Sequence, residues 1–234
     1  MSLARALLST ILVLCDQVAF GFTRTHGIYH APCNISPSEP RTLAGHLRRT
    51  QRTALLLLAL FEWLAVIDVL HTAYHGHASP FTSLCQTTSS AWPALAATQA
   101  TTLGVVLATL GALLRLDAGA APAGLSLPAV PRTSPMRSRW HAYVRHPEEA
   151  GALLSVAGAV LLHLTSKGWL ATCSPSLLMG PLGRSTAAVL YWGCWLLATA
   201  AEMRGKEDGM RVTLRKQWAS YTSIVRWKVI PGVY

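Results

Sequence analysis

Apolar residues are concentrated in five long stretches of the chain, which are separated by polar segments rich in arginine. A helix needs about 20 mainly apolar residues to cross the ~30 Å hydrocarbon core of a bilayer. Five segments approach this length, and they run from Leu3 to Phe22, Thr53 to Ala73, Ala94 to Leu116, Ala150 to Leu170 and Thr186 to Met203. The pattern predicts an all-α, polytopic integral membrane protein with about five transmembrane helices.

The distribution of lysine and arginine supports this assignment, because cytoplasmic loops carry an excess of both. The stretches 24–52, 115–146 and 204–234 hold 17 of the 20 basic residues, and the other three are Arg5, Lys167 and Arg184. Basic stretches alternate with stretches poor in basic residues along the chain. We therefore expect the N-terminus outside the cytosol and the C-terminus inside it.

The composition agrees with a membrane protein and excludes several soluble classes. Hydrophobic residues make up 51% of the 234 residues and charged residues only 13%, whereas about 25% charged residues is usual in soluble domains. The net charge of +10 does not indicate a nucleic-acid partner, since the basic residues lie between apolar runs. The five cysteines form no CxxC pair, which favours neither a disulfide framework nor a zinc site.

The first apolar segment has a second interpretation, as a cleaved signal peptide. Arg5 would be its charged start and Ala6 to Cys15 its apolar core. Cleavage would place the arginine-rich stretch 24–52 in the lumen unless the remaining topology inverted. Asn34, in Asn34-Ile35-Ser36, is a glycosylation acceptor if it faces the lumen. A glycan at Asn34 would contradict the topology that we predict.

Small residues recur at four-residue spacing in the third and fourth segments, where they would let two helices approach closely. They are Gly104, Ala108 and Ala112 in the third segment, and Gly151, Ser155 and Ala159 in the fourth. This stripe predicts helix packing and carries no chemistry.

Ionisable residues within membrane segments are candidates for function by default. Asp68 can reach the outer interface, and Glu62, nearer the middle of its segment, can bond a neighbouring helix. His71 and His75, with His77, have a spacing at which histidines can share a metal ion, but no second acid or cysteine cluster accompanies them. We therefore predict no metal site, and we interpret His163 as a packing residue.

Two polar segments on the predicted cytosolic side carry the candidate chemistry. The first covers residues 139–151, RWHAYVRHPEEAG. Pro147 suits the first turn of a helix, and acids in that turn meet the positive end of the helix dipole. Arg145 and His146 beside a helix N-terminus can also orient an anionic or zwitterionic ligand. Both interpretations, a helix start and a ligand site, stay open.

The second polar segment covers residues 202–234. At its start acids alternate with bases, which is typical of a solvated turn or an exposed helix. Further on, aromatic and apolar residues recur at near-helical spacing between basic residues, as in an amphipathic helix in the headgroup region. The residues of this second pattern are Trp218, Tyr221, Val225 and Trp227. They predict a C-terminal interfacial helix.

These two segments, in this order and spacing, resemble the isoprenylcysteine carboxyl methyltransferase family, and the resemblance covers about half of the chain, from Gly111 to Tyr234. It rests on Gly111–Leu116, on Tyr143–Pro147 followed by Gly151, on Glu207-Asp208, and on the ending with Trp218, Tyr221, Val225 and Ile230–Tyr234. The short segment Ala31–Asn34 is similar too, more weakly.

The resemblance implies the organisation and activity of the chain. Residues 1–116 would form a three-helix membrane region with a cytosolic arginine-rich loop, and residues 117–234 a methyltransferase-like region. The family consists of multi-pass enzymes of the endoplasmic reticulum membrane. They transfer a methyl group from S-adenosyl-L-methionine to the C-terminal carboxylate of a prenylated cysteine. Prenylated protein C-termini or prenylcysteine, together with membrane lipids, would be the partners.

The resemblance also implies the site residues. The cofactor-binding residues would be His141, Arg145, His146, Pro147, Glu149 and Glu207. Glu207 would be a catalytic residue as well. An arginine that faces the substrate carboxylate is expected at the position of Met203, and Arg204, the nearest arginine, would be the second catalytic residue. No metal ion is implied.

The chain departs from the family at several positions. Glu149 stands where the family has tyrosine, and Arg139-Trp140-His141 replaces a Gly-Pro-Tyr. The family's His-x-Leu-Val is not recognisable in Thr133–Met136, and the Phe-Gly before the final aromatic helix is absent. Two alternatives therefore stay open: a methyltransferase acting on a phospholipid amine or another lipophilic acceptor, and a catalytically silent membrane scaffold or lipid-binding relative.

Overall fold

The structure, a computed structural model, describes residues 2–25, 43–76, 97–119, 139–165, 170, 180–230 and 232. Within these residues the secondary structure is helical, apart from one isolated bridge between Val144 and Trp227. The all-α prediction is thus confirmed for this part of the chain. The elements are α1 (Ser2–Thr25), α2 (Leu43–His75), α3 (Gln99–Gly119), the short 3₁₀ helix η4 (Arg139–Ala142), α4 (Pro147–His163), α6 (Pro181–Leu214) and α7 (Lys216–Ile224).

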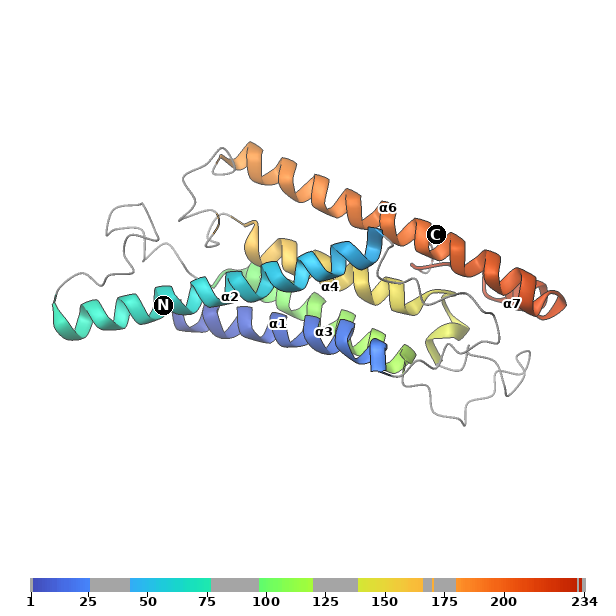
Figure 1. Cartoon of the computed structure of the whole chain (residues 1–234), viewed down its shortest axis with the longest axis horizontal. Helices are drawn as coiled ribbons and strands as arrows, with labels where there is room; N and C mark the ends of the chain where they lie inside the picture. Colours follow the sequence, from blue (N-terminus) through green and yellow to red (C-terminus); the bar gives the residue numbers. More distant parts are fainter. Residues whose placement is uncertain are drawn as a thin grey trace.

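The five long helices lie lengthwise beside one another, and each runs antiparallel to the one before it (Figure 1). One end of the bundle therefore gathers the end of α1, the start of α2, the end of α3, the start of α4 and the end of α6. Helix α7 lies at this end as well (Figure 1). It is the end that the distribution of basic residues predicts to be cytosolic, and we call it the α4-start end.

Helices α3 and α4 pack most closely, because glycines face each other across their contact. A Cβ atom at Gly104 would lie 2.7 Å from the carbonyl oxygen of Gly158, and one at Gly111 would lie 2.5 Å from that of Gly151. Only residues without a Cβ fit at such distances. The prediction of a close approach between these helices is confirmed. The boundary proposed between residues 116 and 117 falls within α3, close to its end, so α3 and its packing against α4 join the two proposed regions.

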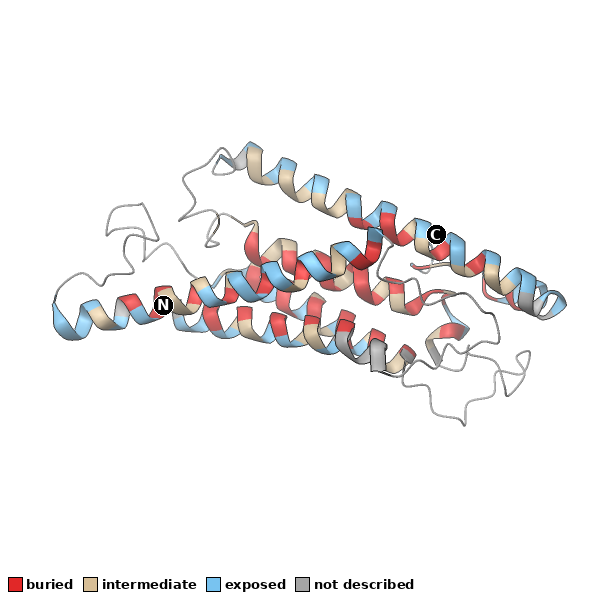
Figure 2. Cartoon of the chain, viewed as in Figure 1, coloured by how far each residue is buried: buried red, intermediate tan, exposed pale blue. Residues whose placement is uncertain are grey.

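Helix α4 is the central helix, and its neighbours turn apolar side chains outward. Eleven of the 17 residues of α4 are buried (Figure 2). The outward apolar residues follow helical spacing, with Leu7, Ile11, Leu14 and Val18 on α1, Leu103, Val106, Leu110 and Leu113 on α3, and Leu182, Val189, Leu190 and Leu197 on α6. Apolar faces of this extent mark contact with lipid or with a partner.

Among the residues that the structure describes, two helices, α2 and α3, are long and apolar enough to cross a membrane by length and composition. The helix ends differ from the predicted segments at several places. Helix α2 begins at Leu43 rather than near Thr53, and α4 ends at His163 rather than at Leu170. Helix α6 continues as one helix to Leu214, so the acids and bases after Met203 lie on a helix and not in a turn.

The predicted C-terminal interfacial helix is shorter than expected and uses its aromatic residues differently. Arg215, with a φ of 40°, separates α6 from α7, and α7 ends at Ile224. Trp218 and Tyr221 pack with Val225 in a buried cluster against the protein. The expectation that these three residues anchor the helix in the headgroup region is therefore wrong. Trp227, beyond α7, is 41% exposed.

A group of charged side chains is buried between α1, α2 and α4, and we call it the inner cluster. Arg5 Nε donates to Glu62 Oε1 over 3.2 Å, and the same guanidinium donates to the carbonyl oxygen of Leu162. His163 Nδ1 lies 3.8 Å from Glu62 Oε1. Glu62 thus bonds a neighbouring helix, as predicted. Arg5, which the signal-peptide interpretation takes as its charged start, is thus packed inside the bundle as part of α1.

Several sequence predictions fall outside the described residues. These are the glycosylation acceptor at Asn34, the segments Ala31–Asn34 and Thr133–Met136, and His77. The rings of His71 and His75 have centroids 4.5 Å apart and are tilted by 43° to each other. Among the residues that the structure describes, no three His, Cys, Asp or Glu side chains are grouped so that they could hold a metal ion.

Candidate functional site

The start of α4 is fastened to the segment that follows α7. His146 is the N-cap residue of α4, and Pro147, which lacks an N–H, is its first residue and is fully buried. The backbone N–H of Arg145 donates to the carbonyl oxygen of Trp227, and that of His146 donates to Lys228, both over 2.9 Å. These two bonds bring the two polar segments of the sequence together.

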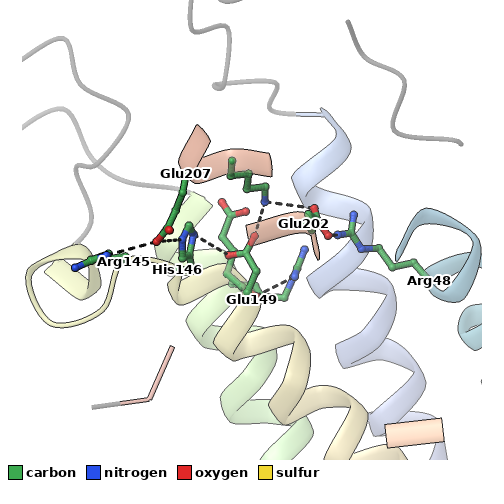
Figure 3. Close-up of polar contacts among 9 residues, drawn as sticks. Arg48, Arg145, His146, Glu149, Glu202 and Glu207 are labelled. Atoms are coloured by element: carbon green, nitrogen blue, oxygen red, sulfur yellow. Dashed lines mark hydrogen bonds and ion pairs between the residues drawn. The ribbon is translucent and has the colours of Figure 1, made fainter. Parts of the chain in front are cut away.

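His146 lies between two carboxylates at the α4-start end (Figure 3). Its Nε2 is 3.4 Å from Glu207 Oε1, and its Nδ1 is 4.0 Å from Glu149 Oε2. Glu149 is one turn further along α4, whereas Glu207 comes from α6, 61 residues away in the sequence. The imidazole therefore connects an acid of α4 with an acid of α6.

From Glu149 a series of alternating charges crosses to α2 (Figure 3). The Lys206 ammonium donates to Glu149 and lies 3.4 Å from Glu202 Oε1. Glu202 also accepts a hydrogen bond from Arg48 on α2. Each carboxylate of the series thus faces a cation. We call this group of charged and polar side chains the terminal network. Its members are Arg48, Glu202, Lys206, Glu149, His146, Glu207, and the two cations beside Glu207, which are Arg145 and Lys228.

On the other side of His146, Glu207 faces two further cations. Arg145 Nη1 is 3.5 Å from Glu207 Oε1, and Lys228 Nζ is 3.5 Å from Oε2. Arg145 also donates to the carbonyl oxygens of Val225 and Thr222, over 2.7 and 3.1 Å. These carbonyls belong to the end of α7, where a helix lacks internal donors. Arg145 therefore caps α7 and contacts Glu207 at the same time.

No protein-family model, curated protein or solved structure matches the chain.

The carboxylates of the terminal network are held ionised. Burial by itself would raise the pKa of Glu149, but the Lys206 ammonium and His146 outweigh it and lower that pKa to about 2. Burial opposes ionisation of Glu207 too, and Lys228, His146 and Arg145 together bring its pKa below the usual range. Conversely, partial burial would lower the pKa of Lys206, but Glu149 and Glu202 outweigh it and raise that pKa. Each acid and base favours the charged form of its neighbour.

For the two histidines, His146 and His141, burial outweighs the neighbouring charges and favours the neutral form. Burial lowers the pKa of His146 and, more strongly, the pKa of His141 to about 4, although nearby carboxylates act in the other direction. Both imidazoles are therefore neutral near pH 7. His141 lies in η4, and its carbonyl oxygen accepts a hydrogen bond of 2.9 Å from the buried hydroxyl of Tyr221. Burial also raises the pKa of that Tyr221 hydroxyl.

The structure brings together six of the seven residues that the sequence proposes for the site. Arg204 is the exception. It is exposed on α6, while its neighbour Met203 is buried against Leu153 and Val229. Successive residues of a helix are about 100° apart around its axis, because one turn takes 3.6 residues. The residues that lie together are His141, Arg145, His146, Pro147, Glu149 and Glu207.

Sequence reasoning missed four members of the terminal network, namely Arg48, Lys228, Glu202 and Lys206. The last two belong to the acids and bases that the sequence assigns to a solvated turn or an exposed helix. Arg48 counted only toward the topology, because nothing in the sequence places α2 beside α6. Lys228 was interpreted as a basic residue of an amphipathic helix. The signal that would have found it is its position two residues before Ile230, within the ending that resembles the methyltransferase family.

Proposed function

We propose that the protein is a membrane methyltransferase that uses S-adenosyl-L-methionine to methylate the C-terminal carboxylate of an isoprenylcysteine. The contact between His146 and Glu207, 3.4 Å long, is the observation that carries the proposal. The resemblance gives cofactor roles to these two residues, and they come from segments far apart in the sequence. Their meeting at the start of α4 supports one shared site.

The chemistry of the side chains fits the cofactor. The methionine end of S-adenosyl-L-methionine carries a carboxylate and an ammonium group, and its sulfonium adds a positive charge. Arg145 and Lys228 offer cations for the carboxylate, while Glu149 and Glu207 offer ionised acids for the positive groups. When bound, this cofactor supplies an electrophilic methyl group.

The acceptor needs positioning more than activation. A carboxylate is already ionised at neutral pH, so no residue has to remove a proton from it. A neutral, buried His146 is consistent with this reaction, because its task is to orient Glu207 and Glu149 rather than to act as a base. Holding the reactants in alignment is then the main contribution of the protein.

The outer surface of the bundle supports a membrane location. Apolar side chains cover the outward faces of α1, α3 and α6, whereas charged groups such as Arg5 and Glu62 are buried between helices. Lipid-facing helices show this arrangement, since polar residues in a bilayer turn toward the bundle interior. We propose that α1, α2, α3, α4 and α6 all cross the endoplasmic reticulum membrane, with the α4-start end in the cytosol.

Binding of S-adenosylhomocysteine to the purified full-length protein tests the proposal. We expect binding by the wild type, and a loss of roughly tenfold or more in Glu207→Gln and His146→Ala, as for charge-assisted hydrogen bonds. Asp208→Asn is the matched control, because Asp208 is the next residue on α6 and is exposed. Wild-type binding no tighter than that of the two variants would refute the proposal.

One observation favours a second candidate, a catalytically silent scaffold. Each acid of the terminal network already has cation partners within the chain, so the network is also a sound way to lock α2, α4 and α6 together. The same titration decides between the two, since a scaffold binds no cofactor. Labelled cofactor offered with an isoprenylcysteine and, separately, with a phospholipid amine then identifies the acceptor.

A further inference from the structure

Exposed apolar side chains gather at the α4-start end, where the segment that follows α7 meets the segment that precedes α4. The bridge between Val144 and Trp227 places these two segments side by side. Four large apolar or aromatic side chains on or next to them are exposed, namely Tyr143 at 64%, Ile224 at 64%, Trp227 at 41% and Ile230 at 52%. A single exposed apolar residue is ordinary. Four at one end of a bundle indicate a surface that binds a partner.

The packing of Val229 fixes the depth of this surface. Val229 lies against Leu153 of α4 and Met203 of α6. Met203 is the last residue of the fifth apolar segment, and Leu153 lies near the start of the fourth. With the proposed membrane location, the stretch 224–230 therefore lies at the boundary between hydrocarbon and water. Tryptophan and tyrosine are enriched at this depth, because their rings are apolar and their polar atoms can reach water.

Cations accompany these apolar residues, and the C-terminal sequence supplies no acid to balance them. Residues 209–234 contain five lysines and arginines and no aspartate or glutamate. The side chains of Arg215, Lys216 and Arg226 are exposed, and within the described part of the chain no carboxylate forms an ion pair with any of them. We call these three cations, together with the four exposed apolar residues, the C-terminal face.

The headgroup layer of a bilayer fits this face better than a soluble acidic protein does. Its apolar residues lie at the depth where headgroups are already present, so no second molecule has to be recruited. Its cations attract anionic phospholipids, which a cytosolic leaflet carries. Protein segments that lie in the interface combine basic and aromatic residues in the same way.

We propose that the C-terminal face docks on the headgroup layer of the membrane and recognises anionic phospholipids there. The inference rests on the proposed membrane location, and it does not depend on methyl transfer. The anchor differs from the amphipathic helix expected from the sequence, because Trp218 and Tyr221 are buried and two separate segments supply the exposed residues. Backbone carbonyls of the docked segment accept the N–H groups of Arg145 and His146. Docking therefore holds the start of α4 at the membrane surface.

Spin labels on the full-length protein in nanodiscs test the depth. With the five native cysteines replaced, Ile224→Cys carries a label on the C-terminal face, Asp208→Cys on an exposed polar position of α6, and Leu190→Cys on the outward apolar side of α6. We expect the accessibilities to oxygen and to a water-soluble nickel chelate to place the label at position 224 between the other two. If this label is as accessible to the chelate as the one at position 208, the inference is wrong and the face is open to a soluble acidic partner. A water-exposed label at position 190 would refute the membrane location, and the inference with it.

The lipid dependence of the label at position 224 tests the charge preference. Phosphatidylserine added to phosphatidylcholine nanodiscs should raise the ratio of lipid-contacting to water-exposed label, and high salt should reverse the rise. We expect that ratio to fall by roughly fivefold for each cation removed in the combined variant Arg215→Gln, Lys216→Gln and Arg226→Gln. Arg49→Gln is the matched control, because Arg49 is an exposed arginine of α2 outside the C-terminal face. An unchanged label at position 190 reports that the variants are folded. An equal response to phosphatidylserine in the wild type and the combined variant would overturn the inference.

Discussion

The inner cluster and the terminal network both place charged side chains among helices, but they differ in access to solvent. In the inner cluster the side chains of Arg5, Glu62 and His163 are 1%, 3% and 4% exposed. In the terminal network exposure rises from 2% at His146 to 28% at Lys228 and 38% at Lys206. One group is closed, and the other is partly open to water at its lysines.

The difference separates a structural use of charge from a chemical one. A closed ion pair holds helices in register but cannot reach a ligand, and its loss leaves a buried charge without compensation. An open network is stabilised less by each pair, because water screens its outer members. Its exposed cations, however, can exchange one carboxylate for another. We therefore expect the inner cluster to govern stability and the terminal network to govern binding.

The largest effect is expected in the inner cluster. Glu62→Gln keeps the shape of the side chain but removes the charge that compensates Arg5, so we expect it to lower the free energy of unfolding by about 3–5 kcal/mol. Thermal unfolding in detergent measures this loss. Replacing both partners, Arg5→Leu with Glu62→Leu, should recover most of it, because no buried charge remains. A double variant as unstable as Glu62→Gln would contradict this explanation.

A Glu→Gln substitution in the terminal network should lower the free energy of unfolding much less. Glu202→Gln leaves Lys206 paired with Glu149 and leaves Arg48 partly exposed to water. We expect a loss of about 1 kcal/mol or less in the free energy of unfolding, as for partly exposed ion pairs. Measured side by side with Glu62→Gln, it tests the comparison directly. Equal losses in the two variants would show that access to solvent does not distinguish the two groups.

The last effect is absent at neutral pH and appears only as the pH falls, and it belongs to the edge of the terminal network. Burial lowers the pKa of His141 from 6.5 to about 4 in the folded protein. A lowered histidine pKa means that the unfolded chain binds more protons, so this contribution to stability is complete above pH 6.5. It is lost as the pH falls from there through about 4.

We therefore expect the unfolding temperature to fall between pH 6.5 and 4, and His141→Gln to make that fall shallower. Part of the fall should remain in this variant, because burial lowers the pKa of His146 too. His46→Gln, at an exposed position of α2, is the matched control. Identical pH profiles for wild type and His141→Gln would show that His141 is not buried in solution.

The sequence was most informative where a pattern repeats. Five apolar segments correspond to the five long helices, and the small residues around Gly104 and Gly151 predicted the closest helix contact correctly. Periodicity of this kind depends only on local geometry, so it can be recognised without knowing the fold. The helix ends were less predictable, since α6 continues through charged residues that are typical of a turn.

The site was predictable only as far as its residues lie near a motif. Glu207 and His146 could be proposed together from the resemblance, but the contacts of Arg48 and Lys228 depend on which elements become neighbours. The position of Arg204 was mispredicted for a different reason, which is local to α6. A shift of one residue along a helix moves a side chain by about 100° around the axis, from the buried face to the exposed face.

The hydrogen bond from the Arg145 side chain to Val225 also has a consequence for biosynthesis. Arg145 must wait for a partner that lies 80 residues later, at Val225, before its guanidinium can cap α7. At about 5–20 residues per second, the ribosome needs several seconds to make that stretch. The site therefore stays open while these residues are made, and it can close only after the segment that follows α7 has left the ribosome.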